Sequence, residues 1–178
     1  MTDLNYTSTL ALSSLIEAGD LSIPELMQST FDRIDEVNCK VNAIVSLGDR
    51  DSLMTEAQVA QAAPRKGWLH GIPIAIKDLA NAEGFVTSMG SPLFEGEVAQ
   101  KDDIVVERLK AAGAIVIGKT NTPEFGLGSH TFNPVFGATK NPYDQTCSAG
   151  GSSGGAAAAL ACGMISVADG SDMMGSLR

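Results

Sequence analysis

Apolar residues near the N-terminus recur at the spacing of an amphipathic helix, in which every third or fourth side chain lies on one face. The first group comprises Leu10, Leu12, Leu15 and Ile16. Gly19 follows this group at a position where a helix would end. A second helix is predicted to open at Ser22, with Pro24 in its first turn and an apolar face made of Leu26, Phe31 and Ile34. The pattern therefore predicts two amphipathic helices.

The rest of the chain alternates short apolar runs with polar or alanine-rich segments. Strands are expected at residues 41–45, 71–78, 114–118 and 164–168. Helices are expected at residues 52–62, 102–109 and 154–162. This alternation is typical of an α/β layer architecture, in which helices cover a sheet. We therefore predict one α/β domain that spans residues 1–178.

Residues 120–151 carry few periodic apolar side chains but many Asn, Thr, Gly, Pro and Phe residues. Gly and Pro punctuate the backbone at intervals throughout this stretch, which favours turns over regular elements. Long loops inside compact domains are usually functional. The stretch is therefore predicted to be a long structured loop that contributes to a site.

The composition agrees with one globular domain. At 178 residues, of which 44% are hydrophobic, the chain can bury a sizeable core. Its formal net charge of −9 is spread along the sequence without a basic cluster. Such a charge would repel nucleic acid and anionic lipid, so neither a nucleic acid nor a membrane is expected as a partner.

The cysteines and the N-terminus bear on the compartment. Cys39, Cys147 and Cys162 make neither an even disulfide set nor a C-x-x-C metal motif, which favours a reducing environment. The sequence opens without a basic segment followed by an apolar one, and no apolar run reaches the length that spans a membrane. We therefore expect a soluble, cytoplasmic protein.

Candidate chemistry lies in two glycine-flanked serine clusters, at residues 150–155 and 170–176. Glycine lets the backbone turn tightly, so hydroxyl groups and N–H groups can point to a common substrate. The first cluster fits the G-x-S-x-G pattern with Ser153 as nucleophile, but His70 and His130 both precede it, whereas that fold needs a later histidine. A phosphate loop lacks its G-K-[ST] sequence here. A capping turn remains the simplest interpretation of this cluster alone.

Three segments of the sequence, considered together, resemble a known family. Residues 71–78, 150–155 and 170–178 resemble, in order and spacing, the amidase signature family. Ser152 follows Lys77 by 75 positions, and Ser176 follows Ser152 by 24 positions, as in family members. Other segments that look like the family are 118–121, 125–126, 133, 136–137 and 141–142. The resemblance covers nearly the whole chain from about Leu10 onward.

The resemblance implies a mixed β-sheet core flanked by helices, and a Ser–cis-Ser–Lys triad. In this triad Ser176 is the nucleophile, Ser152 is the bridging serine that follows a cis peptide bond, and Lys77 is the base. A serine hydroxyl is a weak nucleophile until a base removes its proton. A lysine can be that base only if its pKa falls from about 10.4 towards roughly 7 to 8. Burial among the isoleucines at 72, 74 and 76 would lower it.

Further roles follow from the same resemblance. Backbone N–H groups that would form an oxyanion hole belong to Met173, Met174, Gly175 and Ser176. Met174 stands where family members commonly carry glycine, and it would be strained if that position needs a positive φ. Side chains expected to support the site by hydrogen bonding are Ser153, Ser171, Asp172 and Arg178, the last two also fitting a structural ion pair. Gly126 and Ser129 are expected to lie beside the substrate.

The predicted function is hydrolysis of a small-molecule carboxamide through an acyl-enzyme, with no cofactor and no metal. One alternative is the ammonia-supplying subunit of a glutaminyl or asparaginyl amidotransferase, which would need partner subunits. Family members continue well beyond the position of Arg178, so a second alternative is an incomplete N-terminal portion that is catalytically silent. Such a chain would form a homodimer or associate with its missing C-terminal half.

Overall fold

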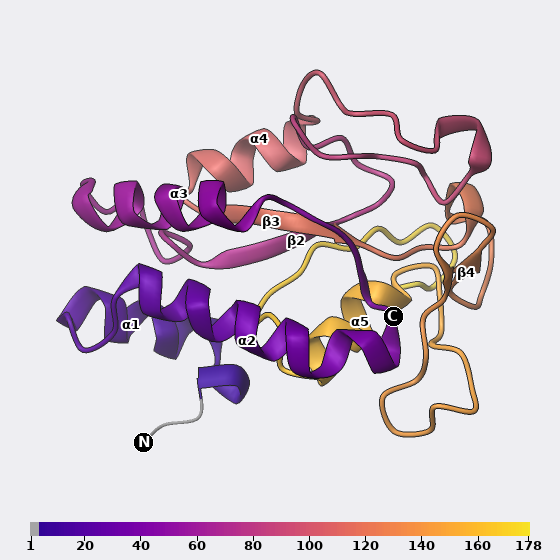
Figure 1. Cartoon of the computed structure of the whole chain (residues 1–178), viewed down its shortest axis with the longest axis horizontal. Helices are drawn as coiled ribbons and strands as arrows, with labels where there is room; N and C mark the ends of the chain where they lie inside the picture. Colours follow the sequence, from indigo (N-terminus) through magenta and orange to yellow (C-terminus); the bar gives the residue numbers. More distant parts are fainter. Residues whose placement is uncertain (1–3) are drawn as a thin grey trace.

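The computed structural model describes residues 4–178. In chain order its elements are η1 (Leu4–Tyr6), α1 (Thr9–Ala18), α2 (Ile23–Val41), β1 (Ile44–Leu47), α3 (Arg50–Ala62), β2 (Pro73–Lys77), η2 (Pro92–Phe94), α4 (Ile104–Ala111), β3 (Ile115–Thr120), η3 (Glu124–Gly126), β4 (Phe132–Asn133), β5 (Gly137–Ala138) and α5 (Gly154–Ala161). Figure 1 shows strands β2 and β3 between layers of helices. The predicted α/β class is confirmed.

Strands β1, β3 and β2 form a mixed sheet in that order. β3 pairs in parallel with β2, with Pro73 opposite Ile115 and Lys77 opposite Thr120. β3 pairs in antiparallel fashion with β1. The mixed sheet predicted from the family resemblance is therefore confirmed, and the parallel pair brings the ends of β2 and β3 to one edge.

Local signals explain where the N-terminal helices begin and end. Ser22 caps α2 in a capping box, in which its side chain accepts from the Glu25 N–H while Glu25 accepts from the Ser22 N–H. Gly19 ends α1 in the left-handed conformation at a φ of 79°, which glycine adopts without a steric penalty. Both predicted amphipathic helices are thus present.

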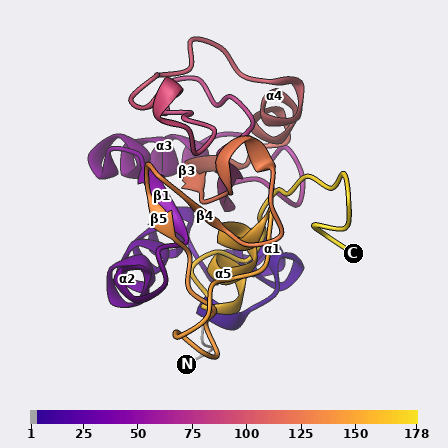
Figure 2. The same cartoon turned by 90° about the vertical axis from the view of Figure 1, so that its right-hand side faces the viewer.

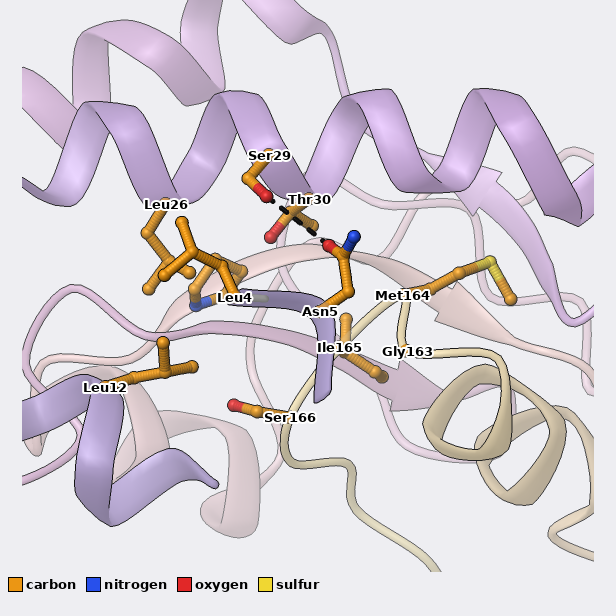
Figure 3. Close-up of a pocket in the computed structure, with 11 residues that line it drawn as sticks. Leu4, Asn5, Leu12, Leu26, Ser29, Thr30, Gly163, Met164, Ile165 and Ser166 are labelled. Carbon is orange, nitrogen blue, oxygen red and sulfur yellow. Dashed lines mark hydrogen bonds between the residues drawn. The ribbon is translucent and has the colours of Figure 1, made fainter. Parts of the chain in front are cut away.

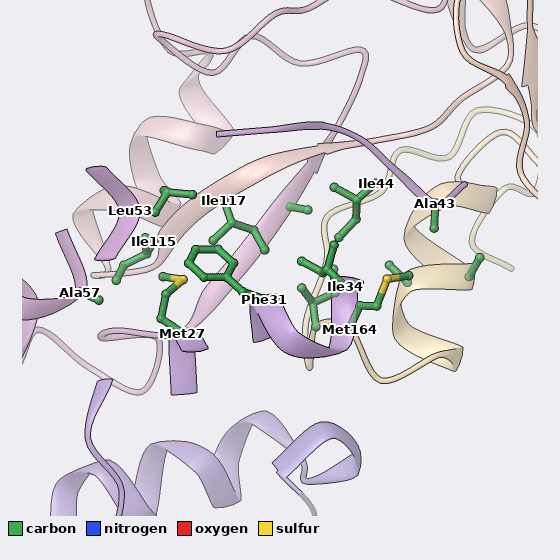
Figure 4. Close-up of a cluster of buried hydrophobic side chains, with 14 of the residues drawn as sticks. Met27, Phe31, Ile34, Ala43, Ile44, Leu53, Ala57, Ile115, Ile117 and Met164 are labelled. Carbon is green, nitrogen blue, oxygen red and sulfur yellow. The ribbon is translucent and has the colours of Figure 1, made fainter. Parts of the chain in front are cut away.

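The sheet separates two groups of buried apolar side chains, because successive residues of a strand point to opposite faces. Ala75, Ile115 and Ile117 pack with α2, α3 and α5, and Figure 4 shows Phe31 and Met27 of α2 in this cluster. Even-numbered β2 and β3 residues pack on the other face with α1 and α4. Figure 2 shows α2 and α3 on one side of β3 and α4 on the other.

Two predicted strands differ from the structure. The run at 41–45 begins within α2, whose last residue Val41 is buried, and the strand is Ile44–Leu47. Asn42 separates the two elements by taking the left-handed conformation. In the run at 164–168, Met164 and Ile165 fill the core beside α5, and only Ala168 pairs, through a parallel bridge to Ala75. The apolar character of most of that run is explained by burial in the core and not by strand pairing.

Packing leaves a small cavity of about 10 Å³ between η1, α1, α2 and the turn at 163–166, drawn in Figure 3. A space of this size holds at most one water molecule. Ser166, which lines this cavity, accepts a hydrogen bond at its carbonyl from Thr9 Oγ1 of α1 at 2.9 Å. Among the helices of residues 4–178, none is both long enough and apolar enough to cross a bilayer.

Candidate active site

Lys77 is the last residue of β2, and all five residues of that strand are buried. The side chain of this lysine is only 1% exposed. Its Nζ lies 2.7 Å from Ser152 Oγ, 2.9 Å from Ser153 Oγ and 3.0 Å from Ser171 Oγ. The Ser171 carbonyl is a fourth neighbour at 3.4 Å. The side-chain amine of Lys77, at the end of β2, therefore lies among three serine hydroxyl groups.

Burial lowers the pKa of Lys77 from 10.5 to about 8, because the uncharged amine loses less hydration than the ammonium ion. The negative charges of Asp169 and Asp172 oppose this lowering. A fraction of the side chain is therefore a neutral amine near pH 7, which a general base requires.

Ser152 and Ser153 occupy the turn that leads into α5. The peptide bond between Gly151 and Ser152 is cis, and Ser153 is the N-cap residue of the helix. Two glycines then let the helix approach the sheet closely. A Cβ atom on Gly155 would lie 2.2 Å from the backbone nitrogen of Asn121, directly after β3, so only glycine fits there. The small-residue start of α5 therefore fixes the serines against the ends of the strands.

Ser176 reaches the same cluster from the C-terminal segment. Its Oγ accepts from the Ser153 N–H at 2.9 Å, and it lies 2.7 Å from Ser153 Oγ. The distance from Ser176 Oγ to Ser152 Oγ is longer, at 3.4 Å. Both serines therefore lie between Lys77 and Ser176, and Ser153, expected only to support the site, makes the shorter contact with Ser176.

Asp172 organises the backbone around Ser176. Its carboxylate accepts from the N–H groups of Gly175 at 2.6 Å and Leu177 at 3.2 Å, and from Nε of Arg178 at 2.8 Å. The guanidinium of Arg178 holds the pKa of the Asp172 carboxyl well below its usual range. Asp172 and Arg178, two of the four residues expected to support the site, thus hold the loop that carries Ser176.

The four backbone donors expected at the oxyanion hole lie in this exposed loop, whose last residues are drawn in yellow in Figure 2. The Gly175 N–H is bonded to Asp172, as described above. Gly175 has a φ of 109°, whereas Met174 is not among the residues with a positive φ. The conformation that favours glycine falls on Gly175, so methionine at 174 meets no such backbone strain.

A cavity of about 430 Å³ opens beside the serines. It is lined by Gly126, Leu127, Gly128, Ser129, Gly151, Ser152, Met173, Met174, Gly175 and Ser176. Both positions expected to lie beside a substrate, Gly126 and Ser129, are in this lining. The cavity is large enough for a small ligand, and Leu127, Met173 and Met174 give it exposed apolar surface.

Three further charged residues lie near the ends of β2 and β3, although the motifs gave them no role. Lys119 and Asp78 are fully buried, with Lys119 Nζ 3.7 Å from Asp78 Oδ1. The Lys119 ammonium also donates to the Ala80 carbonyl at 2.6 Å. Asp169 accepts the N–H of Lys77 through Oδ1 at 2.5 Å. Asp78 and Lys119 lie in segments that resemble the family, but the sequence did not indicate a role for either residue or for Asp169.

Metal ligands are not gathered in the described part of the chain. Among residues 4–178, no group of three or more His, Cys, Asp and Glu side chains could hold a metal ion. His70 Nε2 lies 2.9 Å from the Ala60 carbonyl, away from the serine cluster. The groups that surround Ser152 and Ser176 are an amine, hydroxyl groups, a carboxylate–guanidinium pair and backbone N–H groups.

Comparison with known proteins gives consistent matches. The family model described as Amidase matches residues 25–178. The chain is 42% identical over 159 residues to a glutamyl-tRNA(Gln) amidotransferase subunit of Sulfurisphaera tokodaii, covering 89% of this chain and 34% of the relative. It is 39% identical over 180 residues to the acylamidase of Rhodococcus erythropolis, covering 99% of this chain and 38% of the relative.

Solved structures agree with these sequence relatives. The 6-aminohexanoate cyclic dimer hydrolase superposes with a TM-score of 0.85 at 33% identity, over 94% of this chain and 34% of that chain. Fatty acid amide hydrolase superposes with a TM-score of 0.91 at 27% identity, over 98% of this chain and 32% of that chain. The chain spans about a third of the length of the curated relatives it matches.

Proposed function

The chain belongs to the amidase family, and from this premise we propose that it carries the catalytic apparatus of an amide-bond hydrolase, with Ser176 as nucleophile and Lys77 as base. The observation that carries the proposal is the unbroken series of polar contacts from Lys77 Nζ to Ser176 Oγ. Ser152 lies 2.7 Å from the amine and 3.4 Å from the Ser176 hydroxyl. The pKa of about 8 for Lys77 supports its role as a base near neutral pH.

In the proposed reaction, neutral Lys77 takes a proton from Ser152 as Ser152 takes the proton of Ser176. The Ser176 oxygen attacks the carboxamide carbon and forms a tetrahedral intermediate. The C–N bond then breaks, and the leaving nitrogen receives the proton that returns from Lys77 through Ser152. Water next attacks the acyl-serine ester, which releases the carboxylic acid and restores the Ser176 hydroxyl.

The oxyanion of the intermediate is assigned to backbone N–H groups of the loop at 173–176 other than that of Gly175, which already donates to Asp172. Such donors stabilise developing charge without any particular side chain. Asp172 supports this role because its bonds to the loop and to Arg178 hold the backbone in one conformation. The substrate is proposed to enter the cavity beside Gly126 and Ser129, where the apolar lining favours an amide with a hydrophobic group.

A second candidate function is the ammonia-supplying subunit of a tRNA-dependent amidotransferase. The observation that favours it is that several relatives, including those from Sulfurisphaera tokodaii and Alkaliphilus metalliredigens, are named as glutamyl-tRNA(Gln) amidotransferase subunits. This role requires partner subunits, whereas a free-standing amidase does not. Copurification of partner subunits with the native protein would favour the amidotransferase, and turnover of simple amides without partners would favour the amidase.

Covalent labelling tests the proposal directly. Intact-mass spectrometry after treatment with a fluorophosphonate, a reagent for activated serines, should show one adduct at Ser176. Ser176→Ala and Lys77→Ala should both lose the adduct, whereas Ser14→Ala, which alters an exposed serine of α1, should keep it. Labelling that persists in both site variants would refute the assignment. Absence of any adduct in the unaltered 178-residue chain would favour the catalytically silent alternative.

A further inference from the structure

Asp169 lies where two segments of the site meet. Ala168, the residue before it, forms a parallel bridge with Ala75 of β2. The bridge places Asp169 beside the end of the strand, where its Oδ1 accepts the N–H of Lys77 at 2.5 Å. This carboxylate therefore joins the strand that carries the base to the segment that continues to the nucleophile.

The residues that follow Asp169 make the connection closer. Ser171, two positions later, contacts Lys77 Nζ through its Oγ at 3.0 Å and its carbonyl at 3.4 Å. Asp169 holds the backbone of Lys77 while Ser171 contacts the amine at the end of the same side chain. The lysine is thus fixed at both ends by one short segment.

Charge is the second property that Asp169 supplies. Two buried lysines, Lys77 and Lys119, lie near the buried carboxylate of Asp78 and the half-buried carboxylate of Asp169. Asp78 accepts from Ser88 and Gly90 and lies beside Lys119, 3.7 Å from its Nζ. Asp169 is therefore the carboxylate of this pair that bonds to Lys77.

The other charged groups around these four residues lie towards the surface. The negative charge of Asp172, which pairs with Arg178 in the C-terminal segment, raises the pKa of Lys77. The negative charge of Asp103, at the start of α4, raises the pKa of Lys119. Burial raises the pKa of the Asp169 carboxyl, while the Lys77 N–H and the charges of Lys119 and Lys77 lower it. Asp169 thus faces two cations and accepts the backbone N–H of Lys77.

We propose that Asp169 is the positioning residue of the base: it fixes the backbone of Lys77 by accepting its N–H, and its negative charge balances the buried ammonium formed when Lys77 takes a proton. This inference rests on the proposed role of Lys77 but concerns a residue outside the triad. Asp169→Asn should separate the two contributions, because the amide oxygen of the new side chain keeps the acceptor while the charge is lost.

The test is an NMR titration of Lys77 in the 178-residue chain and in Asp169→Asn. The 13Cε resonance of Lys77, assigned with a Lys77→Arg variant, reports protonation of the amine without any turnover. An opposite charge within about 4–6 Å shifts a pKa by about 1–3. We expect the midpoint of Lys77 to move to lower pH by about one unit in Asp169→Asn, since a neighbouring negative charge stabilises the ammonium ion.

Asp144→Asn, which removes an exposed carboxylate from the loop at 142–147, is the matched control and should leave the midpoint unchanged. An unchanged midpoint in folded Asp169→Asn would overturn the charge-balancing role. If that variant does not fold, the unaltered chain gives the answer: the amide proton of Lys77 should shift as the Asp169 carboxyl titrates, and a flat profile would overturn the proposal.

This readout also separates the inference from the proposed function. A shifted Lys77 midpoint without covalent labelling of Ser176 would leave Asp169 as the positioning residue of the lysine and favour the catalytically silent alternative for this chain. If Ser176 is labelled but the titration midpoint of Lys77 does not shift in Asp169→Asn, the proposed hydrolase is kept and the role of Asp169 is refuted. In a chain that labels, the pH midpoint of the labelling rate should move with that of Lys77.

Discussion

Burial of Lys77 should make the stability of the protein depend on pH in a way that one substitution removes. The folded pKa is about 8, below the ordinary value of 10.5. Between these two pH values the unfolded chain still holds a proton that the folded chain has lost, so raising the pH favours the folded state. The gain begins near pH 8 and is complete by about pH 10.5.

The size of this gain follows from the shift. The full lowering of the pKa corresponds to about 3 kcal/mol of unfolding free energy. Solvent in the adjoining cavity screens part of the effect, so we expect about 2 kcal/mol. The same buried ammonium costs a corresponding amount below pH 8, where both states are protonated. Lys77→Met fills a similar volume without a charge and should show no such pH-dependent gain.

The measurement is a pair of urea titrations of the 178-residue chain and of Lys77→Met between pH 7 and pH 11. Far-UV circular dichroism is the better probe, because the single tryptophan, Trp68, is 51% exposed. Taking the difference between the two proteins at each pH cancels the titration of tyrosines and surface lysines. The burial argument would be refuted if the difference in unfolding free energy between the two proteins did not change with pH. It would also be refuted if the chain that contains Lys77 became less stable relative to Lys77→Met as the pH rises.

Four other substitutions, one of them with a matched control, test the scaffold and the relay. Gly155→Ala should lower the unfolding free energy by about 2 kcal/mol, because its Cβ has no space, whereas Gly150→Ala, which has nothing within 4 Å, should change little in the same urea titration. Ser22→Ala should remove the capping box of α2 and cost about 1 kcal/mol, seen as a lower Tm. Ser152→Ala and Ser153→Ala should each slow serine labelling by about 100-fold, and an unaffected rate in Ser153→Ala would exclude a relay through the shorter contact.

The helices were predictable where their signals are local. The capping residue Ser22 and the terminal glycine Gly19 act on adjacent backbone groups, so the sequence alone indicates both ends. The strand expected at 41–45 was partly wrong because a short apolar run fits the end of a buried helix as well as a strand. Tertiary packing of Val41 against the core decides between them, and no short window of sequence contains that information.

The site was predictable as far as its motifs extend. The spacing between Lys77, Ser152 and Ser176 led to the cluster that the structure brings together, although the catalytic roles stay predictions. The contributions of Asp169 and Lys119 were not foreseen, because a charged residue beside a strand does not reveal whether it is buried or which charge it faces. Ser153 was assigned only a supporting role, since the distances that place it nearer to Ser176 depend on the turn before α5.

The contacts around Lys77 also constrain the order in which the protein folds. Its partners Ser152 and Ser171 lie 75 and 94 residues away in the chain, so each contact closes a long loop. The entropy of closing such loops opposes the contacts until the sheet and α5 have come together. The lysine is therefore desolvated late, and in any species whose loops remain open it regains its ordinary basicity. A lysine that titrates near pH 8 would mark molecules that have completed their tertiary structure.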